Sequence, residues 1–338
     1  MNAYIKAISI YLPEKVITND YFEKEFPDGN IAKISKAIGI ESRHIASKNE
    51  TACDMAVDAA KKLFTENNLN ANDIDFILFC TQSPDYAMPS TSCIIQDRLG
   101  VPTSSGALDY DLGCSGYVYG LSMAKAYIVS GMAKNILLLT GDTIQKYVHP
   151  KDKSNRMLFG EAASATLVST DGFAKIGDFV FGTNGKGAES IIVKTGGARH
   201  LEKIGDFGYD ESGAIQSSDY FYMNGSEVFN FTLECVPTLV KDVLEKNKLQ
   251  LKDIDEFVFH QPNKFTLNTI RKVCKLDKEK FWNDVTSTGN TTSSTIPIAL
   301  DSYLITGDGK CLMLAGFGIG LSWAGCIIKI ENNDECIY

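Results

Sequence analysis

The segment GCSG at 113–116 contains the residue of this sequence best suited to covalent chemistry, Cys114. A predicted strand ends at Leu112, Gly113 permits a sharp turn, and an amphipathic pattern predicts a helix that runs to about Val129. Unpaired amides at a helix N-terminus favour negative charge, so this placement predicts a lowered thiol pKa and a thiolate nucleophile. A buried structural cysteine is the alternative, although only Cys114 of the nine cysteines lies at such an elbow.

Two later segments carry polar residues that can assist such a nucleophile. In FVFHQPNKF, His260 ends a predicted buried strand, and Pro262 suits the first position of the next helix. In STGNTTSSTIP, a turn with Asn290 precedes a helix that starts near Pro297. Taken alone, each has a structural alternative: a histidine bonded to a backbone carbonyl, and a polar loop that caps a helix. The glycine clusters at 182–187 and 316–320 predict turns rather than phosphate loops.

Composition narrows the classes of protein. The 338 residues are 44% hydrophobic and 22% charged, with a formal net charge of -9, which argues against a nucleic-acid binder. The cysteines form no CxxC pair and follow no secretory leader, so we expect neither disulfides nor a metal site, and a cytoplasmic location. No run approaches the roughly 20 apolar residues of a membrane span.

An internal repeat organises the chain. Short apolar runs alternate with amphipathic stretches, which predicts an α/β fold with helices packed on sheets. Residues 67–80 (NNLNANDIDFILFC) and 247–260 (NKLQLKDIDEFVFH) match at six of fourteen positions without a gap. A looser match pairs FGEAASATLV (159–168) with FGIGLSWAGC (317–326). We therefore expect two copies of one unit: an N-terminal half, 1–172, that carries the cysteine, and a C-terminal half, 173–338, that carries the histidine and asparagine.

Together these segments resemble 3-oxoacyl-ACP synthase III, the initiating β-ketoacyl synthase of the thiolase superfamily. The resemblance runs over essentially the whole chain. It rests on GIESRHIA (39–46), ETACDMAVDAA (50–60), GCSG (113–116), YMNGSEVF (222–229), HQPN (260–263), GNTTSSTIP (289–297) and GFGIGLSWAG (316–325). It implies a duplicated thiolase-like fold with a five-layered αβαβα core.

The resemblance also implies a reaction and the residues that perform it. Cys114 would accept an acyl group from a thioester, and His260 with Asn290 would stabilise the enolate left when malonyl-ACP loses CO2. Backbone amides of Cys114 and Ile319 would form the oxyanion hole. The result is a 3-oxoacyl-ACP, in fatty-acid initiation or in a specialised acyl pathway. A non-decarboxylating acyltransferase and a catalytically silent partner subunit are the alternatives.

Partners follow from the same resemblance. It implies an acyl carrier protein, an acyl thioester and a homodimer, with no cofactor, because acyl-CoA or acyl-ACP and malonyl-ACP are substrates. Met88 matches the position at which a partner subunit closes the acyl pocket. A basic stripe that can receive a carrier protein consists of Lys264, Arg271, Lys272 and Lys275.

The chain departs from the family pattern at the nucleotide end of the site. Family members that take acetyl-CoA commonly have a Trp and an Arg before the GIxxR segment, where this chain has Lys33 and Ala37. An Arg used for carrier docking is replaced by Phe265. The platform for adenine is therefore missing, which puts CoA in doubt as the acyl donor.

Overall fold

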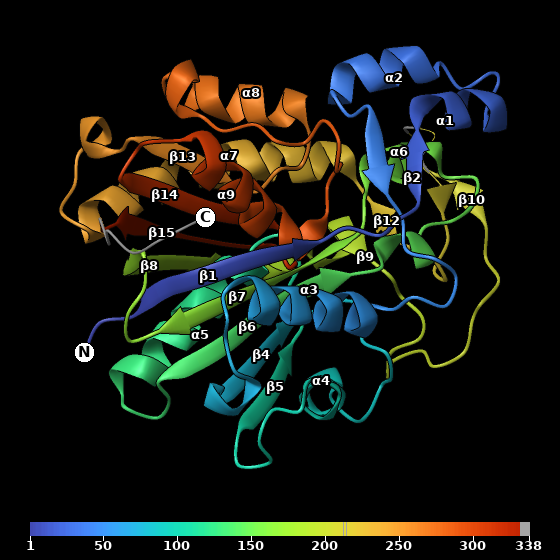
Figure 1. Ribbon diagram of the computed structural model, residues 1–338. Coiled ribbons are helices and arrows are strands. Elements are labelled where there is room, and N and C mark those ends of the chain that lie inside the picture. The colour runs from blue at the N-terminus through green and yellow to red at the C-terminus, as the bar shows by residue number, and fades with distance from the viewer. Residues whose placement is uncertain (212, 214, 332–338) are drawn as a thin grey trace.

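The computed structural model describes residues 1–211, 213 and 215–331 (Figure 1). Its α-helices are α1 (Asn19–Glu25), α2 (Ile31–Ile38), α3 (Ala52–Glu66), α4 (Thr91–Leu99), α5 (Gly116–Val129), α6 (Lys153–Leu158), α7 (Gly225–Lys246), α8 (Lys264–Val273) and α9 (Thr295–Thr306). Its short 3-10 helices are η1 (Ala71–Asp73), η2 (Ile144–Lys146), η3 (Gly185–Ser190), η4 (Leu251–Asp253), η5 (Lys278–Lys280) and η6 (Thr292–Ser294).

The strands of the main sheet are β1 (Tyr4–Tyr11), β4 (Phe76–Cys80), β5 (Gly106–Tyr110), β6 (Asn135–Asp142), β7 (Ala162–Ser169), β8 (Ala174–Thr183), β13 (Glu256–Phe259), β14 (Cys311–Gly318) and β15 (Ser322–Ile330). Three short pairs lie outside it: β2 (Val16–Thr18) with β3 (Ser42–His44), β9 (Ile191–Ile192) with β12 (Tyr222–Met223), and β10 (Gly208–Tyr209) with β11 (Ile215–Gln216).

The main sheet is hydrogen-bonded in the order β13-β14-β15-β8-β1-β7-β6-β4-β5, and its two halves face each other across α5 and α9. Both helices contact strands of both halves, and Leu121 of α5 and Leu300 of α9 belong to the same buried cluster as Leu138 of β6 and Leu314 of β14. On the outer faces, α3 and α4 cover the N-terminal strands, and α7 and α8 cover the C-terminal strands. The layers therefore alternate αβαβα, and the predicted fold class is confirmed.

Four strands of each half follow the same order, and β5, at the outer edge of the N-terminal half, has no counterpart among the described strands of the other half. In each half the first strand pairs antiparallel with the last, the last pairs antiparallel with the strand before it, and that strand pairs parallel with the second: β1-β7-β6-β4 and β8-β15-β14-β13. The boundary between residues 172 and 173 stays a prediction, which this correspondence supports.

The repeated Asp-Ile-Asp sequence has a structural reason. Asp75 and Asp255 each precede a buried strand and lie beside the start of its parallel neighbour. One carboxylate oxygen of Asp75 accepts the backbone N–H groups of residues 134 and 135 at 2.7 and 2.9 Å. An oxygen of Asp255 accepts those of residues 310 and 311, both at 2.9 Å. The carboxylate thus satisfies two amides at the start of a strand, which fixes the register of both pairs.

Candidate active site

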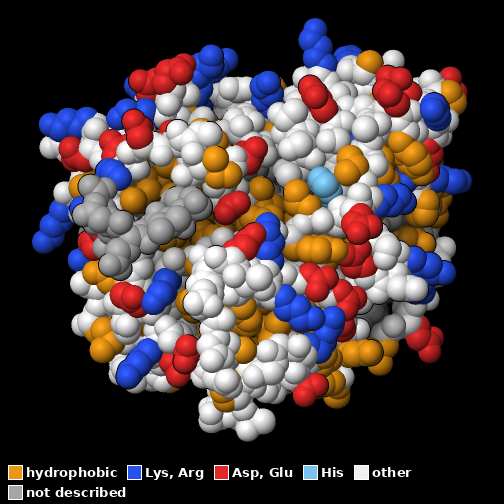
Figure 2. Space-filling view, viewed as in Figure 1, with side chains coloured by type: hydrophobic (Ala, Val, Ile, Leu, Met, Phe, Trp, Pro, Cys, Tyr) orange, Lys and Arg blue, Asp and Glu red, His pale blue; other side chains and the backbone are white. Residues whose placement is uncertain are grey.

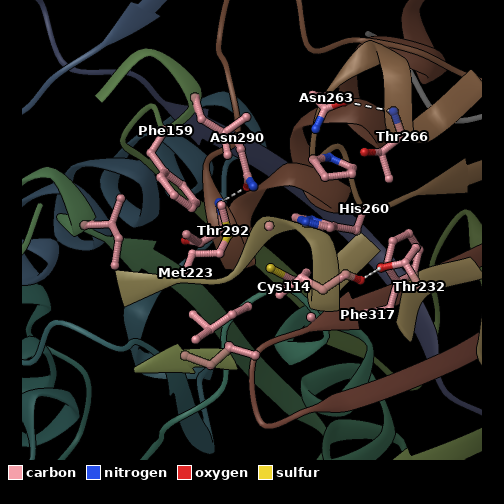
Figure 3. Close-up of a pocket in the computed structure, with 18 of the residues that line it drawn as sticks. Cys114, Phe159, Met223, Thr232, His260, Asn263, Thr266, Asn290, Thr292 and Phe317 are labelled. Atoms are coloured by element: carbon pink, nitrogen blue, oxygen red, sulfur yellow. Dashed lines mark hydrogen bonds between the residues drawn. The ribbon is translucent and has the colours of Figure 1, made fainter. Parts of the chain in front are cut away.

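One mainly apolar cavity, of about 140 Å³, brings the three predicted side chains together. Cys114, His260 and Asn290 all line it (Figure 3). Cys114 comes from the N-terminal half and the other two from the C-terminal half, so the cavity lies where the halves meet. Its apolar lining includes Leu158, Ile191, Phe221, Met223 and Val228.

The elbow that carries Cys114 is close to the one predicted. Strand β5 ends at Tyr110, α5 begins at Gly116, and the N–H of Gly116 donates to the carbonyl of Gly113 at 2.8 Å. Glycines of β14 leave room for the cysteine. A Cβ on Gly318 would lie 2.8 Å from the Cys114 sulfur, and one on Gly316 would lie 2.5 Å from the Cys114 carbonyl oxygen. Strand β14 can approach the elbow only because these positions lack side chains.

The protonation state of Cys114 differs from the sequence prediction. Burial and, to a smaller degree, the charge of Asp142 raise the pKa of the Cys114 thiol to about 12. Hydrogen bonds from the backbone amides of Cys114 and Ile319 act in the opposite direction but do not offset the burial. The expected low pKa of Cys114 was therefore wrong, and the group present at neutral pH is the thiol.

His260 is held at the end of β13 with its ring in the cavity wall. Its side chain is buried, its backbone N–H donates to the carbonyl of Ala315 at 2.8 Å, and its ring meets that of Phe317 edge to face. Burial lowers the pKa of His260 to about 3. The imidazole is therefore neutral at physiological pH, the state needed to donate a hydrogen bond without acting as a strong acid.

Asn290 is fixed by its own turn and by the other half of the protein. Its backbone N–H donates to the carbonyl of Leu158, and its carbonyl accepts the N–H of Gly160, both at 3.0 Å. Its side-chain Oδ1 accepts the backbone N–H of Thr292 at 3.0 Å, the dashed line in Figure 3. The amide nitrogen Nδ2 is the donor of this side chain, and within the described chain nothing accepts a hydrogen bond from it. Asn290 can therefore donate to a ligand in the cavity.

A buried carboxylate supports the turn that follows Asn290. Asp142, at the end of β6, accepts hydroxyl hydrogen bonds from Thr292 and from Ser293, the latter at 2.6 Å, and the backbone N–H of Gln82 at 2.6 Å. Burial raises the pKa of Asp142 to about 6 despite these donors. The carboxylate thus ties the asparagine turn to the N-terminal sheet.

The turn that contains Ile319 is tied to the cysteine elbow. The Ser322 hydroxyl donates to the Ile319 carbonyl at 2.8 Å, and the hydroxyls of Ser115 and Ser322 are 2.8 Å apart. Ser115 directly follows Cys114, so this pair of serines links the two predicted oxyanion-hole amides. Both hydroxyls are buried, which makes the link a fixed part of the cavity wall.

The other predicted positions lie outside the cavity. Met88 is 81% exposed and does not line it. The helical spacing predicted for the basic stripe was partly wrong, because α8 ends at Val273 and Lys275 lies beyond it. The half-buried Arg271 donates to the Leu276 carbonyl at 3.2 Å, and the docking role of the stripe stays a prediction. Lys264 and Lys272 are exposed on the helix as expected. The helix begins at Lys264 with Asn263 as its N-cap, not at Pro262.

Sequence reasoning missed the residues that position the three side chains. Asp142, Thr292 and Thr295 lie far from Cys114 along the chain, and no local pattern pairs them with it. The signal in the sequence was the run of five small hydroxyl residues at 291–295, which leads into the apolar helix α9. The structure buries all five. A metal role has no support in residues 1–211, 213 and 215–331, where no three His, Cys, Asp or Glu side chains gather closely enough to hold an ion.

Comparisons with known proteins agree with this geometry. Residues 108–185 match the family model for 3-oxoacyl-[acyl-carrier-protein (ACP)] synthase III, and residues 244–330 match the model for its C-terminal part. A β-ketoacyl-[acyl-carrier-protein] synthase III of Caldanaerobacter subterraneus is 33% identical, covering 94% of this chain and 95% of its own.

Solved structures extend the match to three dimensions. A crystal structure of a 3-oxoacyl-(acyl-carrier-protein) synthase III is 45% identical, with a TM-score of 0.94 over 98% of this chain and 100% of that one. A 3-oxoacyl-(acyl-carrier protein) synthase from Burkholderia xenovorans is 34% identical, with a TM-score of 0.89 over 98% and 94%.

The layered fold and the cysteine pocket define a thiolase-type acyltransferase. Within that class, the chain belongs to the 3-oxoacyl-ACP synthase III family, as the predicted resemblance implied. In residues 1–211, 213 and 215–331, no helix has the length and apolar character of a membrane span.

Proposed function

We propose that this protein condenses an acyl thioester with malonyl-ACP, with loss of CO2, to give a 3-oxoacyl-ACP. The observation that carries the proposal is the convergence of a thiol, a neutral imidazole and a fixed carboxamide on one cavity. Family membership supplies the substrate class, since the relatives are named for a carrier-protein synthase reaction.

The acylation step uses Cys114. The cysteine sulfur attacks the donor thioester carbonyl, the bond from that carbonyl to the donor sulfur breaks, and the thiol proton leaves with the donor thiol. The tetrahedral intermediate places negative charge on the former carbonyl oxygen. The amides of Cys114 and Ile319 already point at the sulfur, and we assign them to this oxyanion.

The condensation step uses the other two side chains. In malonyl-ACP the bond to the carboxylate breaks, CO2 leaves, and the electron pair moves into an enolate whose oxygen accepts from His260 Nε2–H and Asn290 Nδ2–H. The enolate carbon then attacks the acyl-Cys114 carbonyl, and the Cys114 thiolate departs and takes a proton from solvent. Each such donor typically contributes about 3 kcal/mol in the transition state.

The surroundings of the cavity mouth favour a carrier-bound acyl donor over CoA. Lys33 and Ala37 are exposed on α2 where family members place an adenine platform. Phe265 is 57% exposed and stacks on Phe229, which lines the cavity, with ring centroids 5.4 Å apart. Figure 2 shows basic side chains mixed with acidic ones along the upper edge, where α8 lies, rather than one continuous patch. We assign carrier docking to the lysines Lys264, Lys272 and Lys275, without Arg271.

A homodimer completes the proposal. Strand β5 is the last strand of the main sheet, with no further described strand beyond it, and open edges of this kind are suited to pairing. The exposed Met88 and Tyr86 lie on the loop between β4 and α4, and both of those elements contact β5. Met88 would then reach the acyl pocket of the partner subunit. The cytoplasmic location stays a prediction.

The test uses malonyl-ACP labelled in its free carboxyl group. We expect labelled CO2 and a 3-oxoacyl-ACP when an acyl-ACP is supplied, and neither with Cys114→Ala. Acyl transfer without CO2 would overturn the proposal in favour of a non-decarboxylating acyltransferase. An unmodified Cys114 after exposure to acyl-ACP and acyl-CoA of several chain lengths would favour the silent subunit. A higher rate with acyl-CoA than with acyl-ACP would contradict the assignment of the donor.

A further inference from the structure

The second ring nitrogen of His260 has a single polar partner. Nδ1 lies 2.7 Å from the Thr295 hydroxyl, and both side chains are buried. Thr295 is the first residue of α9, a central helix, so its position is set by core packing. Nothing else in the described chain hydrogen-bonds to Nδ1. The hydrogen position at this contact therefore decides what Nε2 presents to the cavity.

A hydroxyl partner permits a tautomer that a carboxylate or carbonyl partner forbids. An acceptor-only partner requires Nδ1–H, which leaves Nε2 without a proton in a neutral imidazole. A hydroxyl can donate to Nδ1 instead, which places the single ring proton on Nε2. The condensation step needs that arrangement, because Nε2 must donate while the ring stays neutral.

The hydroxyl of Thr295 has one competing acceptor, the carbonyl of Thr292, at 3.0 Å. That carbonyl already accepts the backbone N–H of Thr295. The Thr292 carbonyl therefore keeps a donor when the hydroxyl turns to Nδ1. In the other arrangement Nδ1–H donates to the Thr295 oxygen while the hydroxyl donates to the Thr292 carbonyl, which leaves Nε2 without a proton. Donation from Thr295 to Nδ1 is thus the arrangement that leaves a neutral ring with an Nε2 donor, and it costs the Thr292 carbonyl no partner.

We propose that Thr295 is a positioning residue that donates to Nδ1 of His260 and thereby holds the neutral imidazole as an Nε2–H donor toward the malonyl thioester. The inference rests on the proposed function, since it assigns a purpose to the Nε2 proton. The competing explanation is purely structural: the hydroxyl only closes the turn from Thr292 into α9. The two explanations differ in which variants restore activity and in the tautomer of His260.

The experiment compares Thr295→Val with Thr295→Ser in the full-length protein. Valine is nearly isosteric but has no hydroxyl, whereas serine keeps it. We expect Thr295→Val to lower kcat for malonyl-ACP decarboxylation about tenfold, the effect of one lost hydrogen bond, with little change in KM or in the rate of Cys114 acylation. Thr295→Ser should restore kcat to within about threefold of the wild type.

Nitrogen-15 spectra of histidine-labelled protein provide the second readout. The chain has four histidines, and His260→Gln identifies the relevant signals. The wild type should show the neutral tautomer protonated at Nε2, with Nδ1 accepting a hydrogen bond that Thr295→Val removes. A wild-type ring protonated at Nδ1, or Thr295→Val with wild-type kcat, would overturn the inference.

His260→Ala separates this failure from failure of the proposed function. If His260→Ala retains wild-type decarboxylation, the proposed role of the imidazole is wrong, and the inference falls with it. If His260→Ala loses decarboxylation while Thr295→Val does not, the proposed function stands and only the role of Thr295 is contradicted. Thr295→Val could also lower the unfolding temperature. If Thr295→Ser then restores stability but does not restore kcat, the structural explanation replaces the inference.

Discussion

Cys80 is the last residue of β4 and His260 directly follows β13, the corresponding strand of the other half, yet of the two only His260 lines the cavity. Both follow a repeated Asp-Ile-Asp turn and a buried strand, 180 residues apart. Cys80 is buried beneath the elbow: its thiol donates to the Leu112 carbonyl at 2.8 Å, and a Cβ on Gly116 would lie 2.2 Å from its sulfur. Burial raises the pKa of Cys80 well above its usual value.

His260 occupies the matching position, but the next segment leaves its ring at the cavity wall. There Nδ1 of His260 is hydrogen-bonded to the Thr295 hydroxyl, and Nε2 is left for a ligand. The difference teaches that one strand end can support a nucleophile in one half and provide a hydrogen-bond donor in the other. At Cys80 the start of α5 packs directly on the sulfur, whereas at His260 the start of α9 hydrogen-bonds one ring nitrogen through Thr295 and the ring stays at the cavity.

The largest expected difference is in decarboxylation rate, between substitutions of His260 or Asn290 and a substitution of Cys80. We expect His260→Ala and Asn290→Ala each to lower malonyl-ACP decarboxylation by on the order of 10²–10³, because each removes a donor to the enolate oxygen. Cys114 acylation should persist in both. Cys80→Ser keeps a donor to the Leu112 carbonyl and should leave both rates within about threefold of the wild type. Single-turnover assays of acylation and of CO2 release measure the two steps separately.

Crowding of the nucleophile gives the next largest effect. Gly318→Ala would place a methyl group 2.8 Å from the Cys114 sulfur, and we expect acylation to slow by roughly 10²-fold because the attacking atom is displaced. Gly208→Ala is the control, since its added Cβ meets nothing within 4 Å. Equal acylation rates in the two variants would show that β14 does not confine the sulfur.

The charge of Asp142 should have a smaller effect on Cys114. Asp142→Asn keeps the acceptor for the Gln82 amide but removes a negative charge that raises the Cys114 pKa. Alkylation of Cys114 by iodoacetamide at pH 8 should become about tenfold faster for each unit by which the pKa falls. Peptide mass spectrometry distinguishes Cys114 from the exposed Cys93. Slower or unchanged alkylation would contradict the electrostatic role of Asp142.

The smallest effect concerns stability against pH. Burial holds the pKa of His260 near 3, well below its ordinary value, so between those values the unfolded chain binds a proton that the folded protein does not. Folding stability from this group is therefore present above the ordinary pKa and is lost as the pH falls toward 3.

Urea unfolding of the wild type and His260→Gln from pH 7 to 4 measures this effect. The wild type should lose up to about 1.4 kcal/mol per pH unit relative to the variant. Asp142 and Glu161 have raised pKa values, so they stabilise the folded state as the pH falls, in the wild type and in the variant alike. The effect of His260 is therefore the difference in unfolding free energy between the two proteins at each pH. Parallel profiles would mean that His260 is already charged in the folded state.

Local sequence patterns predicted the layered fold, the elbow and the strand that ends at His260, because periodicity, turn residues and the repeat are all short-range signals. They did not predict the Cys114 pKa, since burial depends on β14 and on the far half of the chain. The same holds for Asp142 and Thr295, whose partners lie 150 and 35 residues away. The residue spacing also predicted that Lys275 lies on the helix, whereas α8 ends at Val273, because nothing in the local sequence marked that end.

The most direct test follows one acyl group through one turnover. The protein is loaded with an acyl-ACP, quenched and digested, and the peptide that contains Cys114 is weighed before and after addition of malonyl-ACP. The account predicts an acyl mass on Cys114 that disappears on addition, with one CO2 released for each acyl group lost. An acyl group on another cysteine, or one that remains on Cys114 while CO2 appears, would contradict it.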